Sequence, residues 1–152
     1  MNFFALSGLT NGLIALMFGF FVVYENRKNV INITCGLLTL ATAVWSLSYW
    51  LWLGFGSSHD LALFFVRLLS LGSTWIPIFY LHWILSLLGL QKRKKFLLLF
   101  GYVITVLLSI FGFSDLFVSG VQQKMYFNFW PNAGILYSFY ISNSYIIFLN
   151  IF

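Results

Sequence analysis

One stretch decides how this chain folds: LALFFVRLLSLGSTWIPIFYLHWILSLLGL, residues 61–90. It is thirty residues long and holds a single charged side chain, Arg67. An apolar helix of about 20 residues is enough to cross the hydrocarbon core of a bilayer. At about 1.5 Å per residue, a straight helix of this length would rise about 45 Å, well beyond a core of about 30 Å. The stretch therefore predicts a transmembrane helix that is tilted or bent.

The composition of the whole chain agrees with a membrane protein. Of its 152 residues, 61% are hydrophobic and 7% are charged, whereas charged residues make up about 25% of a typical soluble domain. Inside lipid the backbone must satisfy its own hydrogen bonds, so only helices and closed barrels can cross. Barrel strands alternate apolar and polar side chains over about 10 residues, but here the apolar runs are continuous. We therefore predict an all-α fold, a polytopic transmembrane helical bundle.

The apolar runs predict about five helices in one domain. A polar, turn-rich interval, residues 119–134, separates the last two runs. The final run continues to Phe152 without a polar tail, so we expect the bundle to be incomplete at that end. The expected helices cover about residues 3–24, 30–53, 61–90, 96–118 and 135–152 of a single transmembrane domain, 1–152.

The basic residues predict how the helices are oriented. Six of the eight lysines and arginines lie in two connections, residues 25–29 and 91–95, while Lys124 is expected on the opposite side. Cytoplasmic loops of membrane proteins carry an excess of Lys and Arg. We therefore expect a multi-pass protein of the cell inner (plasma) membrane, with its N-terminus outside and its basic loops in the cytoplasm. The basic residues form no extended face, so nucleic acid is not an expected partner.

Arg67 is the first candidate for a functional role. It lies about 9 Å below the expected outer end of its helix, and ionisable residues at such a depth are functional candidates by default. The structural alternatives are a side chain that snorkels to the interface or an ion pair. Asp60, two turns earlier on the same face, is the nearest carboxylate in the sequence, and Asp115 is the other one expected at the outer end.

Two further residues of the same stretch are unusual in an apolar helix. Pro77 removes one backbone hydrogen bond and tends to kink a helix, so it either fits an overlong helix to the membrane or acts as a hinge. His82 falls in the expected inner half of the membrane and could titrate or bind a metal or haem. Because no second histidine or cysteine lies at ligand spacing, a hydrogen bond to a neighbouring helix is favoured.

The second predicted helix carries an aromatic stripe, in which Trp45, Tyr49 and Trp52 recur at helical spacing. Near a membrane boundary such residues typically form the interfacial belt. The alternative is a pocket for a lipid, a quinone or another hydrophobic ligand. Cys35 is the only cysteine, and no catalytic triad, carboxylate pair or zinc-binding spacing is present. We therefore expect no enzyme activity, no metal and no cofactor.

Several of these features together resemble a known family, the N-terminal seven-helix membrane region of bacterial sensor histidine kinases. The likeness is strongest in FFVRLLSLGSTWIPIFYLHWILSLLG (64–89), which holds Arg67, Gly72, Pro77 and His82. It extends to LLTLATAVWSLSYWLWL (37–53), DLFVSGV (115–121) and WPNAGILY (130–137).

The resemblance implies a transmembrane sensor whose cytoplasmic output domain is absent from this chain. In that family a dimerisation helix pair with a phosphoacceptor histidine and an ATP-binding domain follow the seventh helix, whereas this chain stops in the fifth. The implied partners are the lipid bilayer, a cytoplasmic kinase or other output domain, and a second copy in a homodimer. Two alternatives stay open: a small transporter or channel component with Arg67 and His82 on a polar path, and a haem- or quinone-binding membrane protein that uses His82.

Overall fold

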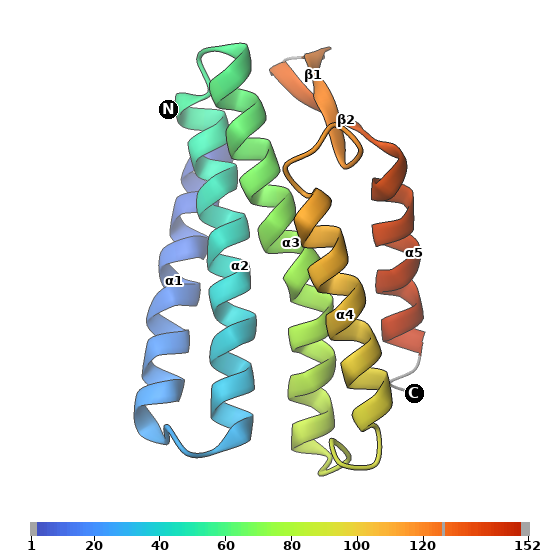
Figure 1. Ribbon diagram of the computed structural model, residues 1–152. Helices are drawn as coiled ribbons and strands as arrows, with labels where there is room; N and C mark the ends of the chain where they lie inside the picture. The colour runs from blue at the N-terminus through green and yellow to red at the C-terminus, as the bar shows by residue number, and fades with distance from the viewer. Residues whose placement is uncertain (1–2, 126, 150–152) are drawn as a thin grey trace.

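The computed structural model describes residues 3–125 and 127–149 (Figure 1). Within these residues the chain is mostly helical, with five helices and one two-stranded sheet. The predicted helices are therefore present, and a β-hairpin is added to the expected all-α fold. The elements are α1 (Phe3–Glu25), α2 (Val30–Phe55), α3 (His59–Leu87), α4 (Lys95–Phe111), β1 (Val118–Lys124), β2 (Phe127–Ala133) and α5 (Ile135–Leu149).

Among the described residues, three helices are long and apolar enough to cross a membrane: α1, α2 and α3, with 23, 26 and 29 residues. Helix α4 is apolar but shorter, with 17 residues. The outward faces of α1 and α4 are apolar as well, which is unfavourable in water and suits lipid. Side chains more than half exposed include Phe18, Phe20 and Phe21 on α1 and Phe96, Phe100 and Ile110 on α4.

Helices α1 and α2 lie close together because small residues line their contact. Gly8 and Gly12, one turn apart on α1, are both buried. A Cβ atom added to Gly8 would lie 3.0 Å from the carbonyl oxygen of Ser46 on α2. At the same level Asn11 donates its Nδ2 to the hydroxyl of Ser46 at 2.6 Å. Backbone contact and one interhelical hydrogen bond thus hold the pair together.

A glycine ends α3 before the apolar run stops. The run continues to Leu90, but the helix ends at Leu87. Gly89 takes a left-handed φ of 67°, and the Leu90 N–H donates to the carbonyl of Leu85 at 2.8 Å, which is the pattern of a Schellman cap. A basic connection, residues 91–94, then leads into α4.

Helix α4 also ends early, at Phe111 instead of the expected Val118. Gly112 weakens the helix at this point, and the chain turns, with the Phe117 N–H donating to the carbonyl of Ser114 at 3.2 Å. The apolar residues that were expected to extend the helix serve another purpose. Phe117 and Val118 are buried in a cluster that joins β1 to α2, α3 and α4.

The strands β1 and β2 form an antiparallel hairpin that pairs Val121 with Pro131 and Gln122 with Trp130. Figure 1 shows this hairpin at the same end of the bundle as the connection between α2 and α3, and we call this the hairpin end. The two basic connections, α1 to α2 and α3 to α4, lie together at the opposite end, called the basic end.

Candidate functional site

The candidate site lies at the hairpin end, where α3, the turn after α4 and β1 meet around Arg67. The Arg67 guanidinium donates from Nη2 to the Asp115 carboxylate at 2.5 Å and to the carbonyl oxygen of Val118 at 3.3 Å. The Arg67 side chain is 17% exposed and that of Asp115 is 84% exposed. The ion pair therefore joins a sheltered cation to a carboxylate at the surface, and it ties the chain entering β1 onto α3. These three residues are called the Arg67 clamp.

The clamp is not fully satisfied. The Nε of Arg67 is buried and has no hydrogen-bond partner in the described part of the chain. A buried polar atom without a partner costs about 1–3 kcal/mol. A ligand that brings an acceptor oxygen to the guanidinium could therefore compete with Asp115, and it would not have to break a full set of hydrogen bonds to Arg67.

Asp60, the nearest carboxylate in the sequence, does not pair with Arg67. Its side chain is fully exposed and lies 3.4 Å from the Nδ1 of His59, its neighbour in the first turn of α3. Two turns of helix separate Asp60 from Arg67, about 11 Å along the axis, so the guanidinium meets the turn after α4 instead. The carboxylate that does pair is remote in sequence and is brought in by the early end of α4.

The aromatic stripe of α2 is divided between two environments. Its rings follow one another, with centroids 6.2 Å apart for Trp45 and Tyr49 and 5.8 Å apart for Tyr49 and Trp52. Trp52 is buried, and its indole N–H donates to the carbonyl oxygen of Phe129 on β2 at 2.9 Å. Trp45, at the other end, is 36% exposed. Trp52 is therefore an anchor for the hairpin, whereas Trp45 remains at the surface of the bundle.

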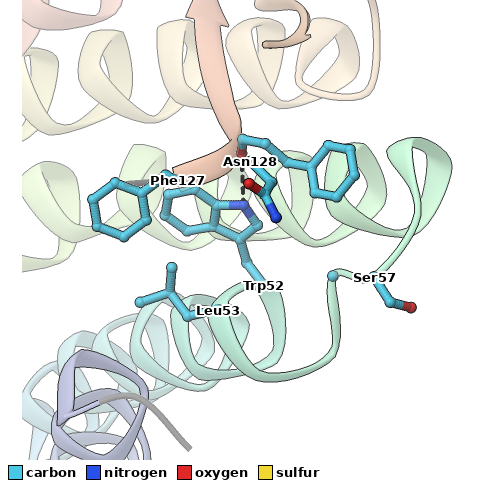
Figure 2. Close-up of a pocket in the computed structure, with 7 residues that line it drawn as sticks. Trp52, Leu53, Ser57, Phe127 and Asn128 are labelled. Carbon is cyan, nitrogen blue, oxygen red and sulfur yellow. Dashed lines mark hydrogen bonds between the residues drawn. The ribbon is translucent and has the colours of Figure 1, made fainter. Parts of the chain in front are cut away.

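A cavity of about 180 Å³ lies beside this anchor, between the end of α2 and β2 (Figure 2). In Figure 2 the ring of Phe127 lies beside the indole of Trp52, the side chain of Asn128 lies near the indole nitrogen, and Ser57 points away from both. The Phe127 and Trp52 rings are stacked, with centroids 6.2 Å apart. The cavity thus has aromatic walls and one side-chain amide.

A second cavity, of about 390 Å³, lies between α3 and the hairpin. Val66 and Ser70 of α3 form one wall, and Gln122 and Lys124 of β1 are among the residues opposite. The Nζ of Lys124 lies 5.8 Å from the ring centroid of Trp130, within the range of a cation–π interaction. The hairpin therefore borders two cavities, and the larger one is lined by Lys124 and by Val118 of the Arg67 clamp.

Pro77 and His82 lie further along α3, away from the clamp. The helix continues through Pro77, which is buried, and Figure 1 shows the axis of α3 changing direction near its middle. The Nδ1 of His82 lies 2.8 Å from the hydroxyl of Tyr102 on α4. This is the hydrogen bond to a neighbouring helix that the sequence favoured for His82.

The polar residues between Arg67 and His82 do not form a connected path. The hydroxyls of Ser70 and Thr74 are buried and donate to main-chain carbonyls of their own helix, at 2.9 and 2.7 Å. Within the described residues no three His, Cys, Asp or Glu side chains lie together as metal ligands would. The site therefore offers a guanidinium, an ammonium group, a carboxylate, aromatic rings and side-chain amides.

Sequence reasoning missed the hairpin and the two carbonyl acceptors that it supplies, Val118 and Phe129. The glycines and polar residues of the interval 119–134 predict turns, whereas the structure forms two strands there. The local signal for the strands is short. Phe127, Asn128 and Phe129 alternate aromatic and polar side chains, but an alternation over about four to eight residues is needed to indicate a half-buried strand.

We compared the chain with protein-family models, curated proteins and solved structures, and none of them matches.

Proposed function

We propose that this chain is a transmembrane input module of the kind found at the N-terminus of bacterial sensor histidine kinases. In this proposal it receives a ligand or a signal from the membrane at the hairpin end and passes it to a cytoplasmic output domain at the basic end. The Arg67 clamp is the observation that carries the proposal. It is a sheltered, incompletely bonded cation that holds a hairpin to the head of a long helix.

The distribution of charge supports the orientation that the proposal needs. The connections that hold Arg27 and Lys28 and residues 92–95 lie together at the basic end, while the hairpin lies at the other (Figure 1). Positively charged connections usually face the cytoplasm. In the inner (plasma) membrane this would place the clamp on the outside, where a ligand could reach it, and α5 would run towards the cytoplasm.

The proposed mechanism is a shift between two arrangements of the hairpin end. A ligand that binds the guanidinium better than Asp115 does would favour an open clamp, and only such a difference in affinity can shift the equilibrium. Helix α3 is continuous from Arg67 to Leu87 near the basic end. Its displacement would therefore reach the cytoplasmic side, where an output domain and a second copy in a homodimer would respond.

The test is a chimera in which Phe152 is joined to the cytoplasmic dimerisation and kinase part of a sensor kinase. Autophosphorylation is measured in membrane vesicles. Arg67→Asp or Asp115→Arg should change its basal level about two- to fivefold, because a pair exposed on one side contributes up to about 1 kcal/mol. The double variant Arg67→Asp/Asp115→Arg should return towards the original level, because it rebuilds the pair with the charges exchanged.

Asp60→Arg is the matched control, since it reverses a carboxylate that is fully exposed and makes no contact with Arg67 in the structure. It should leave autophosphorylation unchanged. If the double variant is no closer to the original than the single variants, or if Asp60→Arg has the same effect, the clamp does not control the output.

A further inference from the structure

Pro77 deprives one main-chain acceptor in the middle of α3 of its donor within the helix. Proline has no N–H, and in an α-helix the N–H of residue i donates to the carbonyl of residue i−4. The carbonyl of Ser73 therefore lacks its donor within the helix. The hydroxyl of Tyr140 on α5 donates to it instead, at 3.2 Å. This bond uses one of the two lone pairs of the carbonyl oxygen.

A cavity of about 580 Å³ is lined by Ser73 and lies between α2, α3 and α5. Ser73 and Pro77 line it together with Tyr140, and Trp45 and Ile141 stand at its edge, 36% and 37% exposed. Small-molecule sites typically have volumes of about 300–1,000 Å³. Its partly exposed edge lies on the side of the bundle, so a molecule dissolved in the membrane could enter it.

Apart from the hydroxyl of Tyr140 and the indole N–H of Trp45, the polar groups of this cavity are acceptors. The side chains of Thr42, Ser73 and Ser144 line it, and each donates its hydroxyl hydrogen to a carbonyl of its own helix at 2.9 Å. Their oxygen atoms can then only accept. The hydroxyl of Tyr140 is also a donor, and it already donates to the Ser73 carbonyl. Trp45, Ile76 and Pro77 supply apolar wall.

We propose that this cavity binds a small apolar molecule bearing a hydroxyl group, which enters from the bilayer and donates to the carbonyl of Ser73. The apolar body of the ligand packs against Trp45 and Pro77. A molecule of the same size without a donor fits the space but leaves the second lone pair of the Ser73 carbonyl oxygen without a hydrogen bond. The inference goes beyond the proposed function and requires neither the output domain nor the Arg67 clamp.

The test uses the whole chain in phosphatidylcholine nanodiscs with 4-bromophenol as the probe, because bromine in contact with Trp45 quenches its fluorescence. The control probe is 4-bromoanisole, in which a methyl group replaces the donor hydrogen. We expect saturable quenching, with half-saturation at about a fivefold lower membrane concentration for the phenol, the ratio that one net hydrogen bond of about 1 kcal/mol supplies.

Two variants distinguish a hydrogen bond to the Ser73 carbonyl from binding that only fills the cavity. Pro77→Ala restores an N–H that donates to the Ser73 carbonyl, so the preference for the phenol should fall. Tyr140→Phe keeps the ring and removes the competing donor, so the preference should persist or grow. Quenching that rises linearly with the concentration of both probes, without saturation, would show that lipid chains fill the cavity. This result would overturn the proposal. Equal half-saturation for both probes, or a preference that Pro77→Ala leaves intact, would overturn it as well.

Discussion

Arg67 shows how a single residue can leave several interpretations open until its neighbours are known. Its position in an apolar run allowed snorkelling, an ion pair or a ligand contact. The structure shows an ion pair with Asp115 and a hydrogen bond to the Val118 carbonyl. Burial of the guanidinium beneath the hairpin explains this choice, because a sheltered cation requires acceptors close by.

Trp52 makes a hydrogen bond whose contribution can be measured. Trp52→Phe would remove the donor to the Phe129 carbonyl of β2. We expect the free energy of unfolding to fall by about 1–3 kcal/mol. The measurement is chemical unfolding of the purified chain in detergent, followed by circular dichroism.

Trp50→Phe is the matched control for this prediction. The Nε1 of Trp50 is buried but has no hydrogen-bond partner in the ranges that the structure describes. Removing an unpaired donor should leave stability unchanged or raise it slightly. Equal losses for Trp50→Phe and Trp52→Phe would show that ring packing, and not the hydrogen bond to Phe129, holds the hairpin.

Helix α3 is the element on which the others converge. Its contact with α2 passes through Gly72, where an added Cβ atom would lie 2.6 Å from the backbone nitrogen of Trp45. Pro77 has no N–H for the Ser73 carbonyl, and the hydroxyl of Tyr140 on α5 donates to this carbonyl instead. The Nδ1 of His82 is hydrogen-bonded to the hydroxyl of Tyr102 on α4. The proline, the histidine and the glycine that the sequence singled out each mark a contact with a different helix.

Gly72→Ala should separate α2 and α3. The methyl group would meet the backbone of Trp45, which cannot move aside as a side chain can, so the two helices must shift. Overpacking of this kind lowers the free energy of unfolding by about 1–3 kcal/mol. We expect a lower midpoint for thermal loss of helical circular dichroism in detergent.

Gly54→Ala is the control within α2, because its Cβ would meet a single atom, the Nε1 of Trp50, at 3.9 Å. It should be neutral or stabilising, as alanine favours a helix over glycine by about 1 kcal/mol. The same loss of stability in both variants would mean that the Gly72 contact is not limiting.

At the scale of the whole molecule, the two ends of the bundle differ in charge and in shape. One end has the basic connections and the other has the hairpin (Figure 1). Two cavities border the hairpin. The asymmetry follows from topology, because antiparallel neighbours place alternate connections at the same end.

Labelling of single cysteines in intact cells tests the orientation. In a Cys35→Ser background, Ser57→Cys at the hairpin end should react with a membrane-impermeant maleimide added outside. Lys94→Cys at the basic end should react only after the membrane is permeabilised, because cationic loops remain in the cytoplasm. Both sites are exposed in the structure, so the opposite labelling pattern would contradict the proposed orientation.

The sequence alone determined that this chain forms long apolar helices, about where each begins, and which connections carry positive charge. These properties depend on composition and on residues near one another in the chain. It did not determine where α3 and α4 end, because Gly89 and Gly112 stop helices inside runs that remain apolar.

Only the tertiary structure decided the partners of the candidate residues. Arg67 pairs with Asp115 and not with Asp60. Trp52 donates to the Phe129 carbonyl. Tyr140 donates to the carbonyl of Ser73, which has no donor from Pro77. Each of these contacts joins residues at least 48 positions apart. They form because packing brings the hairpin against α2 and α3 and brings α5 against α3. Local propensity along the chain carries no information about such long-range contacts.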